Sequence, residues 1–82
     1  MWLNQSERKE RIRAILKNYL RNNADMWVSS IELEKISINN GYKAETGGRR
    51  LREMTQPEHK SFDKEIYHKI VKGIVYYKFI SQ

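Results

Sequence analysis

Residues 65–80, EIYHKIVKGIVYYKFI, alternate between apolar and polar side chains on both sides of a Lys-Gly pair. Such alternation is typical of β-strands, and two strands around a short turn with glycine predict a β-hairpin with Lys72 and Gly73 at its tip. An isolated hairpin is only marginally stable in water, so this one must pack against the rest of the chain. The residues that we expect to share one face of each arm are Ile66, His68 and Ile70, then Val75, Tyr77 and Phe79.

The first part of the chain predicts a helix from Asn4 to Arg21. Apolar residues recur there every three or four positions, which places them in one stripe along a helix. Asn4, with Glu7 three residues later, predicts a capping box at the N-terminus of this helix. The stripe consists of Ile12, Ile15, Leu16, Tyr19 and Leu20.

A short extended segment, Met26 to Val28, follows the first helix. It is too brief to form a sheet by itself, so we expect it to pair with the hairpin as a third strand. Ser29 with Glu32 predicts a second capping box, so a second helix begins there and stops by Ser37. The apolar residues on the expected buried side of this helix are Ile31, Leu33 and Ile36.

A third helix must end by Gln56, because Pro57 disfavours helical backbone in the residue before it. It begins either near Lys43 or with Thr46 as its N-terminal cap. Its two adjacent glycines each cost the helix about 1 kcal/mol relative to alanine. Because glycine has no side chain to keep a neighbour away, we expect another helix to approach closely at Gly47 and Gly48.

The 82 residues suit one domain, which we place at 1–82, and they include no cysteine. Disulfides and thiolate metal sites are therefore excluded. No apolar run is long enough to span a bilayer and no signal-peptide pattern opens the chain, so we expect a cytoplasmic protein with no membrane partner. The formal net charge of +6 favours an acidic partner, and nucleic acid is the commonest acidic partner of a small basic domain.

The predicted order is helix, short strand, helix, turn, helix, loop (57–64) and hairpin, which is the winged-helix arrangement. The segments ILKNYL, WVSSIELEKI, GGRRLREM and EIYHKIVKGIVYYKF also resemble the small winged helix-turn-helix domains of prokaryotic and phage regulators. The resemblance implies an α+β fold with three helices, a short strand between the first two and a C-terminal hairpin wing. It also implies binding of double-stranded DNA, with the third helix in the major groove and the wing on the flanking backbone. The matching positions are Val28, Ser29 and Leu33, then Arg49, Arg50, Leu51, Arg52, Glu53 and Met54, then Gly73 and Tyr76.

A helical projection gives the third helix an inward and an outward side. Arginine is the commonest partner of guanine in the major groove, so we assign base contact to Arg49 on the outward side. Arg50 and Arg52 flank the two sides, and we assign them to phosphates or to a structural ion pair. The alternative is an ordinary solvated helix face, in which arginine pairs with glutamate one turn away. Besides Arg49, the outward side carries Glu45, Thr46 and Glu53, and the inward side Ala44, Gly47, Gly48, Leu51, Met54 and Thr55.

Further cations and hydroxyls complete the expected DNA interface. Lys69 and Lys72, near the hairpin tip, would contact phosphates of the adjacent minor groove. The alternative for these lysines is protection of an edge strand against pairing with another chain. Ser30, next to the capping Ser29, would donate to a phosphate at the N-terminus of the second helix. The full set of expected DNA-binding residues is Ser30, Lys43, Thr46, Arg49, Arg50, Arg52, Lys60, Lys69 and Lys72.

Catalytic chemistry finds no support in the sequence. The two histidines, His59 and His68, do not make a metal site without cysteine, and we expect His68 to pack within the hairpin. No glycine-rich phosphate loop follows a strand, and no pair of carboxylates is spaced for acid–base work. We therefore expect no enzyme activity, no metal, no cofactor and no small-molecule substrate.

The sequence thus predicts a regulator of transcription or replication from a compact prokaryotic, phage or plasmid-type genome. One module of this size contacts little DNA, so we expect a homodimer or a protein partner, with Trp2 and Leu3 as candidate contacts. One alternative is a winged-helix adaptor that inhibits a host protein. Another is a binder of single-stranded nucleic acid or RNA that stacks bases on the sheet. The aromatic residues available for such stacking are Trp27, Tyr67, Tyr76, Tyr77 and Phe79.

Overall fold

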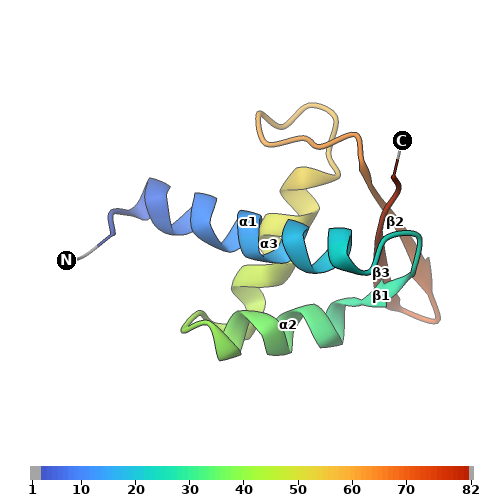
Figure 1. Ribbon diagram of the computed structural model, residues 1–82, viewed down its shortest axis with the longest axis horizontal. Coiled ribbons are helices and arrows are strands. Elements are labelled where there is room, and N and C mark those ends of the chain that lie inside the picture. The colour runs from blue at the N-terminus through green and yellow to red at the C-terminus, as the bar shows by residue number, and fades with distance from the viewer. Residues whose placement is uncertain (1–2, 82) are drawn as a thin grey trace.

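Three helices and a three-stranded antiparallel sheet make up the computed structural model, which describes residues 3–81. The sheet lies at one end of the helices, and α3 crosses α1 in the view of Figure 1. This arrangement confirms the predicted α+β winged-helix layout. In chain order the elements are α1 (Gln5–Asn22), β1 (Val28–Ser29), α2 (Ser30–Asn39), α3 (Ala44–Met54), β2 (Ile66–Val71) and β3 (Ile74–Phe79).

The N-termini of α1 and α2 are capped by side chains, as their sequences predict. The Glu7 amide donates to Asn4 Oδ1 at 2.8 Å, and the Asn4 amide donates to Glu7 Oε1 at 3.1 Å, which completes a capping box. In α2 the Glu32 amide donates to Ser29 Oγ at 3.2 Å. The Glu32 carboxylate accepts instead from the Tyr19 hydroxyl, so it ties α2 to α1 rather than closing a second box.

A glycine ends α2 two residues later than predicted, beyond Asn39. Gly41 has a φ of +84°, and its amide donates to Ile38 O at 3.0 Å. The Tyr42 amide donates to Ser37 O at 2.9 Å, and this pair of bonds is a Schellman motif. The motif reverses the chain within a few residues, so the Tyr42 side chain is buried and α3 starts at once.

The sheet has the strand order β1-β3-β2, with both pairs antiparallel. Val28 pairs with Tyr77, so the predicted third strand exists, although it comprises Val28–Ser29 rather than Met26 to Val28. Lys72 and Gly73 both have positive φ, of 52° and 80°, which is the geometry of a type I′ turn. The predicted hairpin and its turn are confirmed.

The core lies where α1, α2, α3 and the base of the sheet meet, and the predicted stripe of α1 packs into it. Three predictions of burial are wrong. Ile31 is 50% exposed on the outer side of α2, and Ile70 is 67% exposed on β2. His68 is exposed as well, because the hairpin projects beyond the helices and β2 buries only Ile66. The core residues are Ile12, Leu16, Leu20, Val28, Leu33, Tyr42, Leu51, Met54, Ile66, Tyr77 and Phe79.

The connection between α3 and β2 contains no helix or strand, as predicted, but ion pairs fix it to α1. Lys17 Nζ lies 2.6 Å from Asp63 Oδ2 and 3.2 Å from Glu65 Oε1. These bonds raise the pKa of Lys17, and the hydrogen bond from Lys17 contributes to lowering the pKa of Asp63. Leu3 is exposed, whereas Trp2 lies outside the described residues. None of the helices described is long and apolar enough to cross a membrane.

Candidate nucleic-acid interface

The third helix packs against its neighbours with one side only. At Gly47 a Cβ atom would overlap the hydroxyl of Ser37 on α2, so the predicted close approach of another helix is confirmed there. At Gly48 a Cβ atom would meet nothing within 4 Å, so the same prediction is wrong for Gly48. The two glycines lie about 100° apart around the helix, and only the first points at α2.

The exposed face of α3 is centred closer to Arg52 than the helical projection predicts. Arg49 and Arg52 are both exposed, whereas Thr46 is half-buried and Arg50 is only 4% exposed. Glu53, predicted to face outward, is half-buried and lies 3.3 Å from Arg13 Nη2 of α1. Contact with α1 therefore covers the flank of α3 that a helical projection leaves open.

Arg50 occupies an unusual position for a cation. Its Nε lies 3.3 Å from Glu53 Oε1, but the geometry is not that of a hydrogen bond, and this buried atom has no hydrogen-bond partner among residues 3–81. Burial lowers the pKa of Arg50, because the charged form loses hydration that the nearby Glu53 only partly replaces. Of the two predicted roles, the structural ion pair is present in this imperfect form.

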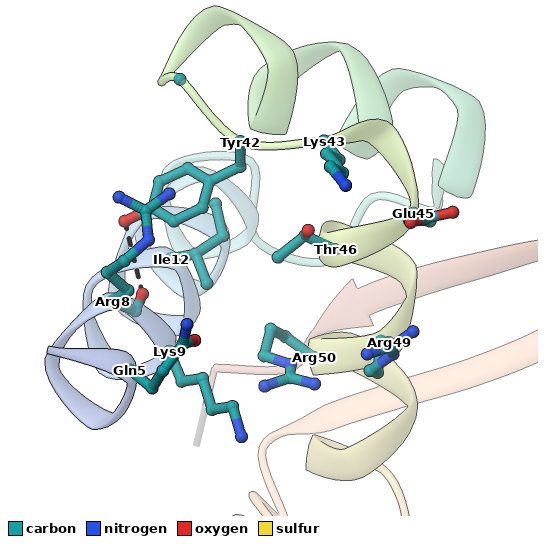
Figure 2. Close-up of a pocket in the computed structure, with 11 residues that line it drawn as sticks. Gln5, Arg8, Lys9, Ile12, Tyr42, Lys43, Glu45, Thr46, Arg49 and Arg50 are labelled. Atoms are coloured by element: carbon teal, nitrogen blue, oxygen red, sulfur yellow. Dashed lines mark hydrogen bonds between the residues drawn. The ribbon is translucent and has the colours of Figure 1, made fainter.

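A groove separates the N-terminal half of α1 from the first turns of α3, as Figure 2 shows. Its volume is about 540 Å³. Five of its lining residues are cations and one, Glu45, is a carboxylate. The cations are Arg8, Lys9, Lys43, Arg49 and Arg50.

Tyr42 forms one wall of this groove and holds α1 close to the start of α3. The guanidinium of Arg8 lies 4.8 Å and that of Arg11 5.6 Å from the centre of the Tyr42 ring. Arg11 Nη1 donates to the Tyr42 hydroxyl at 3.0 Å, and this hydroxyl donates to Arg8 O at 3.3 Å. Both arginines are exposed, and a cation–π contact at an exposed site contributes about 0.5–1 kcal/mol.

Two cations predicted for the wing lie in different environments. Lys72 is exposed in the turn, as expected for a cation at the tip. Lys69 lies over the Trp27 ring, with its Nζ 4.4 Å from the ring centre, and Lys78 Nζ lies 4.6 Å from the same centre. Lys69 is therefore engaged on the outer face of the sheet, opposite to the face that buries Tyr77.

The charge of Arg52 acts on a tyrosine of the sheet. Burial raises the pKa of Tyr77 in β3, and the positive charge of Arg52, which lies on the open face of α3, opposes that rise.

The structure gathers only part of the predicted site. Lys43, Thr46, Arg49 and Arg50 line the groove. Ser30 begins α2, at the end opposite to the groove. The exposed Lys60 lines a second cavity of about 390 Å³, together with Lys9, Arg13 and Glu53.

Sequence reasoning missed the contribution of α1 to this site. Gln5, Arg8 and Lys9 precede the buried Ile12 by seven, four and three positions. This is the spacing of one helix face, so a projection of α1 beyond its apolar stripe could have found them. Tyr42 was missed because nothing local in the turn shows that its ring folds back onto α1.

Residues 3–81 include no group of three or more acidic or histidine side chains placed to hold a metal ion. No family model matches this chain, and neither the curated proteins nor the solved structures searched contain a match.

Proposed function

We propose that this protein binds double-stranded DNA, with α3 in the major groove and the wing on the adjacent backbone. One observation carries the proposal: the face of α3 that no other element covers presents Arg49 and Arg52. A helix fits the major groove, and an exposed arginine there can donate two hydrogen bonds to guanine. Regulation of transcription or replication is the role that suits such a module.

The wing and the charge of the chain support the same proposal. Lys72 projects at the tip of the hairpin, where its ammonium group is free to approach a phosphate. The net charge of +6 strengthens binding to any polyanion and steers its approach.

A second candidate function, binding of single-stranded nucleic acid, rests on the outer face of the sheet. Trp27 lies there between two lysines, and Tyr67 is largely exposed on β2. Aromatic rings beside cations can stack unpaired bases and hold their phosphates. This surface faces away from the core, so the two candidates can be tested with separate substitutions.

Selection from a random duplex pool at two ionic strengths tests the proposal. We expect enrichment of a preferred sequence and an affinity that falls steeply with salt. The logarithm of the binding constant should fall with the logarithm of the salt concentration by a slope of about 0.9 per neutralised phosphate. Arg49→Ala should weaken binding to that sequence by about 1–3 kcal/mol and relax one base position. Lys72→Ala should weaken all duplexes alike, and Lys35→Ala on α2 serves as the matched loss of one exposed charge.

Two results would contradict DNA reading by α3. The first is duplex affinity that is unchanged by Arg49→Ala, Arg52→Ala and Lys72→Ala. The second is a preference for unpaired oligonucleotides that Tyr67→Ala abolishes, which would favour the outer face of the sheet instead.

A further inference from the structure

We infer that the groove between α1 and the start of α3 is a binding site for a phosphate group. The inference deepens the proposed function and in part rests on it, since a backbone phosphate beside the reading helix is one source of such a group. A free phosphorylated small molecule is the other source. The shared chemistry is a tetrahedral oxyanion that accepts several charge-assisted hydrogen bonds.

The first argument is the balance of charge in the groove. Five cationic side chains line a space of about 540 Å³ together with one carboxylate, Glu45. Four of these cations are exposed and screened by water, so the repulsion between like charges is strongest for the buried Arg50. An anion in the groove removes this repulsion. The neutral lining residues Gln5 and Thr46 add polar groups that can also bond to oxygen.

The second argument is Arg50. It is more than nine-tenths buried, lines the groove, and its guanidinium points from α3 toward the groove side and Lys9 (Figure 2). Its Nε is buried, lies 3.3 Å from Glu53 Oε1 and has no hydrogen-bond partner among the described residues. A buried cation without full pairing costs folding free energy. A phosphate in the groove would supply negative charge beside this guanidinium.

The third argument is the N-terminus of α3. Side chains cap α1 and α2, whereas Lys43, the cap residue of α3, makes no side-chain hydrogen bond to this helix. The first turn of this eleven-residue helix therefore presents uncapped amide groups and the positive end of the helix dipole. Lys43 and Glu45 line the groove at this turn, whereas the amide of Thr46 donates to Lys43 O at 3.1 Å. Helix N-termini that open onto such a space bind phosphate in many proteins.

The groove also has the right size and position. Sites for small molecules measure about 300–1,000 Å³, so a phosphate with an attached sugar fits here. Arg49 belongs both to the groove and to the exposed face of α3. A backbone phosphate in the groove would therefore lie directly beside a base contacted by α3.

Titration with inorganic phosphate, followed by NMR at constant ionic strength, tests the site in the free protein. We expect the Arg50 Nε–H signal and the amide of Glu45 to shift in a saturable way. Chloride at the same ionic strength should leave them in place. Shifts that do not saturate, or that are spread over the exposed lysines, would overturn the inference.

Three variants sharpen the test. Arg50→Met should weaken phosphate binding roughly tenfold, as should any loss of a charge-assisted hydrogen bond. Glu45→Gln, which removes the only carboxylate, should tighten binding about two- to fivefold. Thr46→Val probes the hydroxyl without a change of charge, and Lys35→Gln on α2 is the charge control. If Glu45→Gln and Arg50→Met leave the affinity for phosphate unchanged in folded protein, the groove is not the site.

Two further experiments distinguish a DNA phosphate from a small phosphorylated ligand, and distinguish failure of the groove from failure of DNA binding. A duplex that competes with inorganic phosphate, and whose affinity falls with Arg50→Met and rises with Glu45→Gln, identifies the DNA backbone. A mononucleotide that binds the groove while duplex does not identifies a small ligand, and DNA binding then fails although the site stands. Conversely, duplex binding that depends on Arg49 and Arg52 but on neither Arg50 nor Glu45 supports DNA binding and overturns the groove.

Discussion

The packed and the open sides of α3 consist of similar residues in opposite environments. Each has a glycine and an arginine, and the two glycines and the two arginines are adjacent in the sequence: Gly47 and Arg50 on the packed side, Gly48 and Arg49 on the open side. Ser37 of α2 lies against Gly47, and α1 and Glu53 enclose Arg50. The role of a position in α3 is therefore determined less by its residue type than by whether a neighbouring helix covers it. The packed side sets the stability of the fold, and the open side is available to a ligand.

The difference between the two sides of α3 can be tested most directly by replacing each glycine with alanine, beginning with Gly47. We expect Gly47→Ala to lower the free energy of unfolding by about 1–3 kcal/mol, because the new Cβ overlaps the Ser37 hydroxyl. Ser37→Ala removes that hydroxyl, so the double variant should recover at least part of the loss. Urea denaturation of the four proteins gives the coupling between the two positions. Strictly additive effects would show that α2 and α3 are not in close contact there.

Arg50 offers the next largest effect, with the opposite sign. Its lowered pKa means that burial of the charge opposes folding, so removal of the charge should stabilise the protein. We expect Arg50→Met to raise the free energy of unfolding by about 1 kcal/mol, because Glu53 keeps its ion pair with Arg13. Chemical denaturation at neutral pH measures this change. A loss of more than about 2 kcal/mol would mean that Arg50 is chiefly a structural cation.

Much of the fold follows from the sequence because it depends on local signals. The capping residues, the stripe of α1 and the alternating hairpin each act within a few residues. The failures concern what lies further away. A helical projection of α3 cannot show that α1 covers its flank at Arg50 and Glu53. The alternation of the hairpin likewise cannot show that β2 extends beyond the helices, so that Ile70 is exposed. Four of the eleven residues that line the groove come from α1, which is far from α3 in the chain.

On the open side, Gly48→Ala is the counterpart of the change at Gly47. Nothing lies within 4 Å of the added methyl group, and alanine favours helix more than glycine does. The free energy of unfolding should rise by about 0.5–1 kcal/mol. Thermal denaturation of Gly48→Ala and Gly47→Ala should give changes in the free energy of unfolding of opposite sign. A loss of stability at both positions would indicate that α3 is covered on both sides.

The smallest effects on stability should come from the exposed arginines. Arg49→Gln and Arg52→Gln should each change the free energy of unfolding by less than about 0.5 kcal/mol, because neither side chain is buried. In the same proteins duplex affinity should fall, which separates folding from binding. Circular dichroism melts and fluorescence anisotropy with duplex provide the two readings. Destabilisation that accounts for the whole loss of affinity would place these arginines in the packed part of the helix.

The turn at Lys72 and Gly73, where both residues have positive φ, allows the length of the wing to change. The strands near it are mostly exposed, and the turn is shaped by its own backbone rather than by the helices. Insertion of two residues in each arm would extend the wing by roughly 7 Å and return every side chain to its original face. Insertion of one residue in each arm would exchange the two faces of the tip. The wing can therefore be lengthened without any change to the helices that carry it.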